Sequence, residues 1–265
     1  MNTVIGEGVT RVDGGHEVHC GDTLQVMRGM DSSTIDVVAT DPPFSSGTRR
    51  EGAKGLRKAM NRATEDAEWF GTDSLTTNGF VWLMRECAIE WRRLLKPGGH
   101  LLVFIDWRML PALSGAVESA DLRHAGVLVW DKTYFGMGAC FRNQHELVLH
   151  FTKGVGSAPA RRDMGNVLRH PPVRNGLHET EKPVPLLRDL LSVVGHRGAR
   201  VLDSYCGSGP TLVAARDLGM VGVGIEVEPE HCATTIARLT HDRAAAVAAR
   251  AGEAIPGNLF DGVAA

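Results

Sequence analysis

An acid, two prolines and an aromatic residue stand together at residues 41–44, directly after the apolar run IDVVAT at residues 35–40. The rings of Pro42 and Pro43 stiffen the backbone where the chain presents Asp41 and Phe44. An exocyclic amino group could donate one hydrogen bond to the Asp41 carboxylate and another to the Pro42 carbonyl oxygen. Two such acceptors would draw the nitrogen lone pair out of conjugation with its ring, while Phe44 stacks on that ring. The stretch therefore predicts chemistry at the amino group of an aromatic ring.

A glycine turn is the second candidate, in the stretch VLDSYCGSGPTLVAA at residues 201–215. A strand is expected to end at Asp203, and Gly207 and Gly209 then let the backbone approach a ligand that a side chain would exclude. The next strand carries Glu226, whose carboxylate can accept hydrogen bonds from both hydroxyls of a ribose. These residues predict a nucleoside site at the carboxyl ends of adjacent strands. A strand-to-helix turn that binds nothing is the alternative for the glycine turn alone.

Strands that alternate with helices would position both candidates. Apolar runs bounded by turn residues predict strands at 35–40, 100–105, 126–130, 146–151, 199–205 and 221–227. Helical periodicity predicts helices at 80–95 (ended by KPGGH), 183–194 (Pro183 in its first turn), 211–220 (capped by Gly219) and 231–251. Nearly continuous apolar strands between helices imply a mostly parallel sheet that is covered on both faces. The expected fold class is a doubly wound α/β fold.

The chain of 265 residues, 43% of them hydrophobic, is expected to form one domain, residues 1–265, with a substantial core. Two polar inserts rich in glycine and arginine, at about 45–78 and 153–182, interrupt the alternation. We expect them to be surface loops or a small lobe.

Composition excludes several classes of protein. A net charge of −2 and a pI near 6.6 do not indicate a nucleic-acid binder, so any such partner must meet a local basic patch. The five cysteines form no C-x-x-C pair, and His145 and His150 lack the H-E-x-x-H spacing, so we expect neither a disulfide framework nor a metal. Residues 1–15 lack a basic segment followed by an apolar one, so no signal peptide is expected, and no apolar run approaches the roughly 20 residues of a membrane span. We expect a cytoplasmic protein without membrane contact.

The two motifs resemble the catalytic and cofactor motifs of the amino-methylating DNA methyltransferases, which use S-adenosylmethionine on adenine N6 or cytosine N4. The catalytic motif comes first, an order similar to the β group of that family. Counterparts also exist for HCGDTLQVMRGMDSSTIDVVATDPPF, LLKPGGHLLVF, VWDKTYFGMGACFRNQHELVLHFTKG and HETEKPVPLLRDLL, so the resemblance spans most of residues 19–235.

The resemblance implies a Rossmann-like methyltransferase core and a set of site residues. Asp41, Pro42, Pro43 and Phe44 would be catalytic. Asp22 is expected near the adenine of the cofactor, and Thr180 and Lys182 near its methionine portion. The full expected cofactor set is Asp22, Thr180, Lys182, Asp203, Tyr205, Cys206, Gly207, Ser208, Gly209 and Glu226.

Three departures from the family pattern are visible. Phe44 replaces the usual Tyr and keeps the stacking face without the hydroxyl. Ser204, Tyr205 and Cys206 stand where a Pro-Phe-Ala run is common. Glu181 replaces the usual Gln, which places an acid near a cofactor whose amine and sulfonium are cationic.

Double-stranded DNA is the implied partner, and a base amino group can be reached only when the base is flipped out of the duplex. Basic residues of the two inserts are candidate phosphate contacts: Arg49, Arg50, Lys54, Arg57, Lys58, Arg161, Arg162 and Arg174. Solvated loops with ordinary surface charge are the alternative. A homodimer is a further hypothesis, because the chain has little mass to spare for gripping DNA.

Asp at the head of the Pro-Pro motif favours adenine N6 over cytosine N4, because Ser is common among the cytosine enzymes. Two alternatives from other classes stay open, a non-catalytic DNA-binding module and a nicotinamide-dependent oxidoreductase. The intact Asp41 argues against the first, and the bulky Leu212, at the third position of G-x-G-x-x-G, argues against the second. No motif indicates the DNA sequence recognised or a restriction partner.

Overall fold

The computed structural model describes residues 3–4, 8–43, 77–136, 140–173 and 181–240. The helices of these ranges are α1 (Thr23–Gly29), α3 (Thr77–Leu94), α4 (Leu110–Glu118), α5 (Val184–Val194), α6 (Pro210–Asp217) and α7 (Pro229–Leu239), with a short 3-10 helix at Asp13–Gly15. The strands are β1 (Thr3–Val4), β2 (Val9–Val12), β3 (His16–Cys20), β4 (Ile35–Thr40), β5 (Leu95–Ile105), β6 (Arg123–Asp131), β7 (His145–Thr152), β8 (Val167–Arg169), β9 (Arg200–Asp203) and β10 (Val221–Glu226).

The strands in the described part of the chain form one sheet in the order β1-β2-β3-β10-β9-β4-β5-β7-β6-β8. The central neighbours β3, β10, β9, β4 and β5 are all parallel. Antiparallel pairs lie on both sides of this block, since β2 pairs with β1 and β3, and β7 enters between β5 and β6. The expected α/β fold with a mostly parallel sheet is confirmed.

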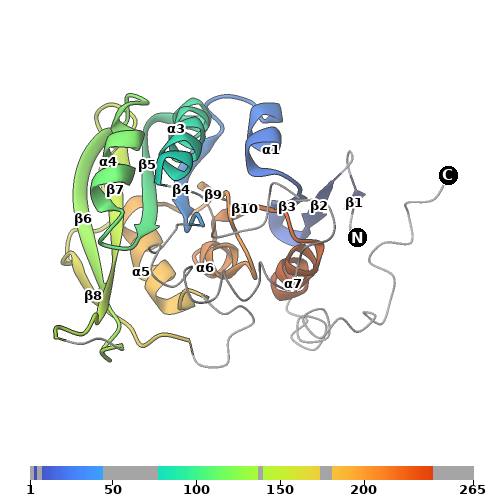
Figure 1. Ribbon diagram of the computed structural model, residues 1–265. Helices are drawn as coiled ribbons and strands as arrows, with labels where there is room; N and C mark the ends of the chain where they lie inside the picture. The colour runs from blue at the N-terminus through green and yellow to red at the C-terminus, as the bar shows by residue number, and fades with distance from the viewer. Residues whose placement is uncertain (1–2, 5–7, 44–76, 137–139, 174–180, 241–265) are drawn as a thin grey trace, which may run out of the picture.

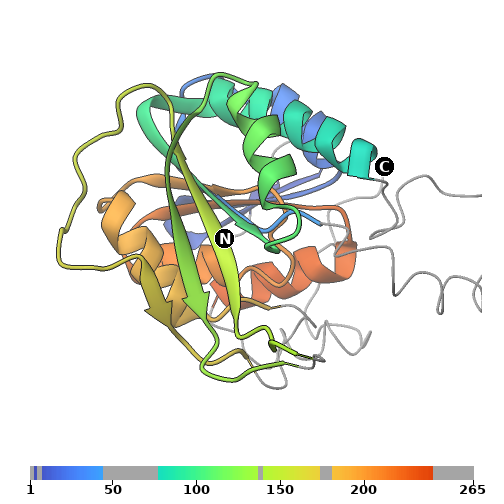
Figure 2. The same ribbon diagram turned by 60° about the vertical axis from the view of Figure 1, so that its left-hand side comes forward.

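Helices cover both faces of the sheet, with α1, α3 and α4 on one face and α5, α6 and α7 on the other (Figure 1). Figure 2 brings the β6–β7 side of the sheet forward between these two layers. Each layer is held by its own buried apolar cluster, one around Trp91 and Leu101 and the other around Leu187 and Val201. Burial on both faces explains why the central strands are apolar almost throughout.

The helix α3 shows how the sequence produces one of these layers. Phe80, Met84, Cys87, Trp91 and Leu94 recur every three or four residues and are fully buried. This spacing places them on one stripe of an α-helix, which packs on the sheet.

The strand β5 begins earlier than the sequence pattern predicts. The helix α3 ends at Leu94, close to the expected end before KPGGH, and this stretch also belongs to the irregular start of β5, where Leu95 already pairs with Ile35. The register shifts here, and Gly98 takes up the extra length with a φ of 79°. The ammonium of Lys96 stabilises this β-bulge by donating to both carboxylate oxygens of Asp36 at 2.8 and 2.9 Å.

Other boundaries also differ from the expected ones. The strands β1, β2, β3 and β8 and the helices α1 and α4 were not predicted. β8 returns part of the 153–182 insert to the sheet edge beside β6. β9 ends at Asp203, as the glycine-turn motif predicts, although the apolar run was expected to extend to residue 205. Pro183 is the N-cap of α5 rather than part of its first turn. Residues 77–78 of the other insert begin α3, whereas the rest of that insert and residues 241–251 of the last predicted helix lie outside the described residues.

No helix within the described ranges has the length and apolar character to cross a membrane.

Replacing Trp91 with alanine is expected to lower the free energy of unfolding by about 3–5 kcal/mol, because a fully buried ring leaves a cavity. Urea unfolding measures this loss. Trp82→Ala is the matched control in the same helix, because that side chain is 61% exposed and should change stability by no more than about 0.5 kcal/mol. Equal losses for the two variants would contradict this account of the core.

Candidate functional site

The two candidate motifs lie at the same edge of the sheet. β4 and β9 are hydrogen-bonded parallel neighbours with Val38 opposite Leu202, and β9 continues to β10 with Asp203 opposite Gly224. Asp41, Asp203 and Glu226 therefore follow or end three adjacent strands at their carboxyl ends. Open α/β sheets bind ligands at this edge.

Asp41 is held by a buried cation. The ammonium of Lys182, 8% exposed, forms an ion pair with Asp41 Oδ2 and lies 3.6 Å from Glu146 Oε2. Burial alone lowers the pKa of Lys182, but the carboxylates of Asp41 and Glu146 outweigh burial and raise it. Burial likewise raises the pKa of Glu146, but the ammonium groups of Lys182 and Lys132 outweigh burial and lower it. The cation is thus fixed in its charged form between two acids.

Asp203 ends the strand beside the one that Asp41 follows, and it is buried. Burial, with a further contribution from the nearby charge of Asp41, raises its pKa to about 6, although hydrogen bonds from Thr211, Thr40 and the Tyr205 N–H act in the opposite direction. The Tyr205 N–H donates to Asp203 Oδ1 at 3.1 Å. Asp203 therefore shapes the turn from below and does not face solvent.

Ser204 ties the two motifs together, although sequence reasoning gave it no role beyond a departure from the family pattern. Its hydroxyl accepts from Trp91 Nε1 at 3.1 Å and bonds the hydroxyl of Thr40 at 3.1 Å. Its carbonyl oxygen accepts from the hydroxyl of Thr23 at 2.6 Å. Four elements thus meet at one buried serine, and Thr40 directly precedes Asp41.

The glycine turn has the conformation that its sequence requires. Gly207 and Gly209 have positive φ values of 51° and 77°, and Gly209 is the N-cap of α6. A Cβ on Gly209 would lie 2.6 Å from the Thr235 side chain, whose hydroxyl donates to the Gly207 carbonyl at 2.8 Å. Gly209 is therefore needed for the turn to fit against α7, and Gly207 suits the left-handed backbone of the turn.

Glu226 is oriented by the backbone of this turn. One carboxylate oxygen accepts from the Gly207 N–H at 2.9 Å, and the other accepts from the Glu228 N–H at 2.9 Å. A carboxylate has about four lone-pair positions, so both oxygens keep acceptor capacity. The carboxylate is suited to accepting hydrogen bonds from a diol.

Arg238 of α7 closes the other side of the turn. Its guanidinium donates to the Ser208 carbonyl and hydroxyl at 3.0 and 3.1 Å and to Glu181 Oε1 at 3.0 Å. Glu181 is 6% exposed, so the acid that departs from the family pattern is countered by a nearby cation. Neither Arg238 nor Glu146 was singled out from the sequence. The available signal for Glu146 was an acid at the start of the apolar run predicted at 146–151.

The remaining expected cofactor residues have structural roles of their own. Asp22 follows β3, beside Glu226, and its carboxylate caps α1 by accepting from the Gln25 N–H at 2.9 Å. The Tyr205 hydroxyl lies 3.3 Å from Cys87 Sγ. Cys206 is buried, and burial raises the pKa of its thiol, so only its backbone is available to a ligand in the turn.

Several predicted residues fall outside the described part of the chain: Phe44, Arg49, Arg50, Lys54, Arg57, Lys58, Arg174 and Thr180. Of the basic residues that are described, Arg162 is exposed, whereas Arg161 is paired with Asp163 through two contacts of 2.7 Å. Much of the charge of Arg161 is therefore balanced by its neighbour, which weakens its case as a phosphate contact.

The histidines that could suggest a metal have other partners. His150 Nε2 lies 2.9 Å from His100 Nδ1 and the rings stack, while burial lowers the pKa of His150 to about 4. His16, in β3, accepts the Gly222 N–H at 2.9 Å. Within the described ranges, no group of His, Cys, Asp or Glu is arranged to hold a metal ion.

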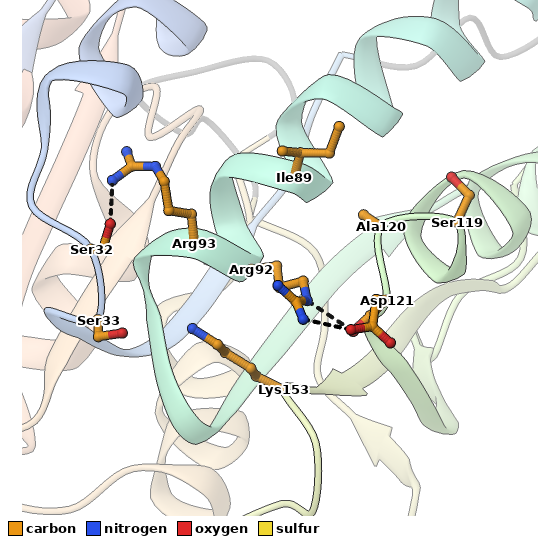
Figure 3. Close-up of a pocket in the computed structure, with 9 residues that line it drawn as sticks. All are labelled: Ser32, Ser33, Ile89, Arg92, Arg93, Ser119, Ala120, Asp121 and Lys153. Carbon is orange, nitrogen blue, oxygen red and sulfur yellow. Dashed lines mark hydrogen bonds and ion pairs between the residues drawn. The ribbon is translucent and has the colours of Figure 1, made fainter.

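An open hollow of about 660 Å³ lies at the opposite edge of the sheet (Figure 3). Its lining residues precede β4, β5 and β6 in the chain or follow β7. Some of them form ion pairs with one another, as Arg92 does with Asp121 at 2.5 Å. Arg93 donates to the carbonyls of Met27 and Met30 at 2.6 and 2.7 Å. These charged side chains connect segments at the amino ends of the strands, and they lie away from the motif residues at the carboxyl ends.

Comparison with known proteins identifies the family. A family model described as DNA methylase, covering N6 and N4 methyltransferases, matches residues 35–237. The chain belongs to the N6/N4 DNA methylase family. It is 31% identical to YubD of Escherichia coli strain K12 over 208 residues, which are 78% of this chain and 82% of that protein. It is 21% identical to the type II methyltransferase M.HpaI of Haemophilus parainfluenzae over 238 residues, 80% of this chain and 70% of the relative.

Solved structures share the fold of this DNA methylase. A Thermus thermophilus protein solved with S-adenosyl-L-methionine has a TM-score of 0.65 and 19% identity, covering 92% of this chain and 96% of that one. The cytosine-N4-specific PvuII DNA methyltransferase has a TM-score of 0.66 and 16% identity, covering 90% and 93%. The expected Rossmann-like methyltransferase core is confirmed.

Replacing Lys182 of the methylase with methionine is expected to lower the free energy of unfolding at pH 7.5 by about 3–5 kcal/mol, because two partly buried acids lose the buried cation that they share. The pKa of Glu146 is lowered in the native protein, so this contribution is present above its ordinary pKa and is lost as pH falls through the lowered value. Urea unfolding at several pH values should show the deficit shrinking on acidification.

Lys96→Met is the matched control, because Lys96 is 44% exposed and its pair with Asp36 should contribute at most about 1 kcal/mol. An equal loss in the two variants would contradict the role assigned to the buried cation.

Asp203→Asn is expected to be more stable than the wild-type methylase above pH 6, by up to about 3 kcal/mol. The folded-state pKa of Asp203 is raised, so the wild-type protein loses stability as pH rises from about 4 through about 6, whereas asparagine does not titrate. Urea unfolding of both proteins from pH 4 to 8 measures the difference. A difference that stays constant over this range would show that Asp203 is not the titrating group.

Proposed function

We propose that this DNA methylase transfers a methyl group from S-adenosylmethionine to the exocyclic amino group of a base extruded from double-stranded DNA, with adenine N6 as the preferred acceptor. One observation carries the proposal. Asp41, which is expected to accept a hydrogen bond from the target amino group, follows β4, and β4 is the parallel neighbour of β9, which leads into the glycine turn. The family assignment supports the reaction class, and the geometry supports the choice of residues.

The cofactor-binding residues fit S-adenosylmethionine. Glu226 would accept hydrogen bonds from the ribose hydroxyls, because its carboxylate is oriented by two backbone N–H groups and keeps acceptor capacity. The turn from Gly207 to Gly209 offers backbone without side chains on the path of the ligand. When bound, the cofactor supplies a methyl carbon on a positively charged sulfur, which a neutral amine can attack.

Asp41 and Pro42 would prepare the amine. The Asp41 carboxylate can accept a hydrogen bond from the target amino group in addition to the one from Lys182. Buried Pro42 gives its carbonyl a fixed direction, because the proline ring restricts the backbone. Two acceptors on one amino group would localise its lone pair and stabilise the positive charge that develops on nitrogen as the bond to the methyl carbon forms and the carbon–sulfur bond breaks. The Asp41 carboxylate would be positioned to accept the proton that the nitrogen then loses.

Lys182 would keep the Asp41 carboxylate ionised and therefore able to accept hydrogen bonds. The resemblance assigned Lys182 to the methionine portion of the cofactor, and its contact with Asp41 supports a second role in holding the carboxylate charged and in place. Both roles are compatible, because the turn and Asp41 lie at one edge.

The preference for adenine rests on Asp41 itself, since Ser at this position is common among the cytosine enzymes. Cytosine N4 is the alternative, and one structural neighbour is cytosine-N4-specific. A homodimer and a cytoplasmic location remain predictions from the sequence.

Mass analysis of nucleosides from DNA treated with the protein and S-adenosylmethionine is expected to find N6-methyladenine. Asp41→Ala should lower the rate at least about 100-fold, because it removes one of two acceptors for the reacting proton. Glu118→Ala, an exposed acid of α4, is the control and should retain full activity.

N4-methylcytosine without N6-methyladenine would reject the adenine preference. Full activity in Asp41→Ala would reject the catalytic assignment. Calorimetry that shows selective binding of NAD over S-adenosylmethionine would favour a nicotinamide enzyme instead.

A further inference from the structure

Three large aromatic side chains are exposed on the hairpin that joins β6 to β7. Tyr134, Phe135 and Phe141 are 54%, 59% and 100% exposed. Single exposed apolar residues are common on proteins, but several large ones gathered in one short loop indicate a contact surface. No role was assigned to these residues by the sequence motifs, and the site described above does not include them.

The hairpin stands at the same edge as the candidate active site. β7 is antiparallel to β5 and pairs Leu147 with Ile105, so the β6–β7 connection emerges where β5 ends. Figures 1 and 2 show this connection beyond the ends of β6 and β7, in the green part of the chain. A chain of ion pairs links it to the acceptor: Lys132 binds Glu146 at 2.5 Å, Glu146 lies near Lys182, and Lys182 binds Asp41.

The described part of the hairpin is built to present these rings. The Lys132 N–H donates to the Gln144 carbonyl and the Gly136 N–H to the Asn143 carbonyl, each at 2.8 Å. Arg142 donates to the Gly136 carbonyl at 2.6 Å, and its guanidinium lies 4.3 Å from the centre of the Phe135 ring. The ring of Phe135 is therefore already stacked, whereas Phe141 is fully exposed.

The charge of the hairpin indicates the kind of partner. Residues 132–144 contain Lys132 and Arg142 and no acid. Aromatic faces with a stacked arginine suit nucleic acid, because bases stack on such rings and the guanidinium binds phosphate. A duplex that has lost one base from its stack presents an apolar gap, which proteins commonly fill with a large side chain.

We propose that the β6–β7 hairpin is a DNA-contact element, in which Phe141 and Tyr134 pack against the bases beside the extruded one and Arg142 faces a phosphate. This inference rests on the proposed function, because it assumes that a base leaves the duplex to reach Asp41. It adds a binding element to the two inserts expected from the sequence, at a position fixed by the sheet.

The test compares Phe141→Ala and Tyr134→Ala with Val155→Ala, an 81% exposed side chain near the opposite edge of the sheet. The DNA probe is a duplex that contains the site methylated by the wild-type protein, as mapped in DNA from expressing cells. Each hairpin variant is expected to lower kcat/KM on this duplex about 5- to 150-fold, the range of losses for one base-stacking ring. Calorimetry should give an unchanged Kd for S-adenosylmethionine, and urea unfolding an unchanged midpoint.

A second duplex, in which the target base is mispaired, distinguishes stacking beside the extruded base from nonspecific binding to DNA. A mispaired base costs less to extrude, so the loss caused by Phe141→Ala should be smaller on this probe. Arg142→Gln should reduce the slope of log Kd against log salt by about 1, as expected for one lost phosphate contact.

Hairpin variants that match Val155→Ala on both duplexes would overturn the inference while leaving the proposed function intact. A wild-type protein that binds S-adenosylmethionine but methylates no DNA would instead refute the proposed function. Light scattering that shows a wild-type dimer dissociating in Phe141→Ala, with DNA binding unchanged, would assign the hairpin to an interface between copies of this chain.

Discussion

Three carboxylates at one edge of a parallel sheet are the constraint around which this molecule is built. Asp41, Asp203 and Glu226 follow neighbouring strands, and like charges so close together oppose folding. Each is accommodated by different means. Asp41 is paired with the buried ammonium of Lys182. Burial raises the pKa of Asp203 to about 6, and the Glu226 carboxylate accepts hydrogen bonds from two backbone N–H groups. The carboxylates can therefore stay where chemistry requires them.

These three solutions draw on separate parts of the fold. The ammonium belongs to Lys182, in the segment before α5, and Asp203 is buried at the end of β9. The backbone donors belong to the glycine turn and to Glu228, directly before α7. Ser204 and Arg238 then join the parts, the first through Trp91, Thr40 and Thr23 and the second through Ser208 and Glu181. These contacts hold the described groups of the edge in place without a ligand, which is the arrangement that the proposed catalysis by preorganised groups needs.

The sequence predicted the central elements well and the margins poorly. β4 matches its expected bounds of 35–40, because an apolar run ends there at an acid and two prolines. β3 was missed because His16, Glu17 and His19 give it a polar composition, and β8 because only Leu168 of its three residues is buried. Local pattern has no access to the neighbouring strands that decide such cases.

The same limit applies to the site. The order of motifs placed Asp41, Gly207 and Glu226 together, since parallel strands share an edge. The contact between Asp41 and Lys182 joins residues 141 positions apart, and only the folded chain brings Glu146 to the same ammonium. Spacing along the sequence carries no information about a pair of this kind.

The reversed direction of β7 has a consequence for how such proteins can diversify. Because β7 runs against β5 and β6, the turn between β6 and β7 opens on the reactive rim, while the parallel block that bears the carboxylates is left untouched. Changes of length or composition in that turn leave the register of the parallel strands unchanged. If the turn contacts DNA as proposed, the architecture separates the proposed reacting groups from a tip that can vary, and grafting that tip from one homologue onto another is expected to alter specificity.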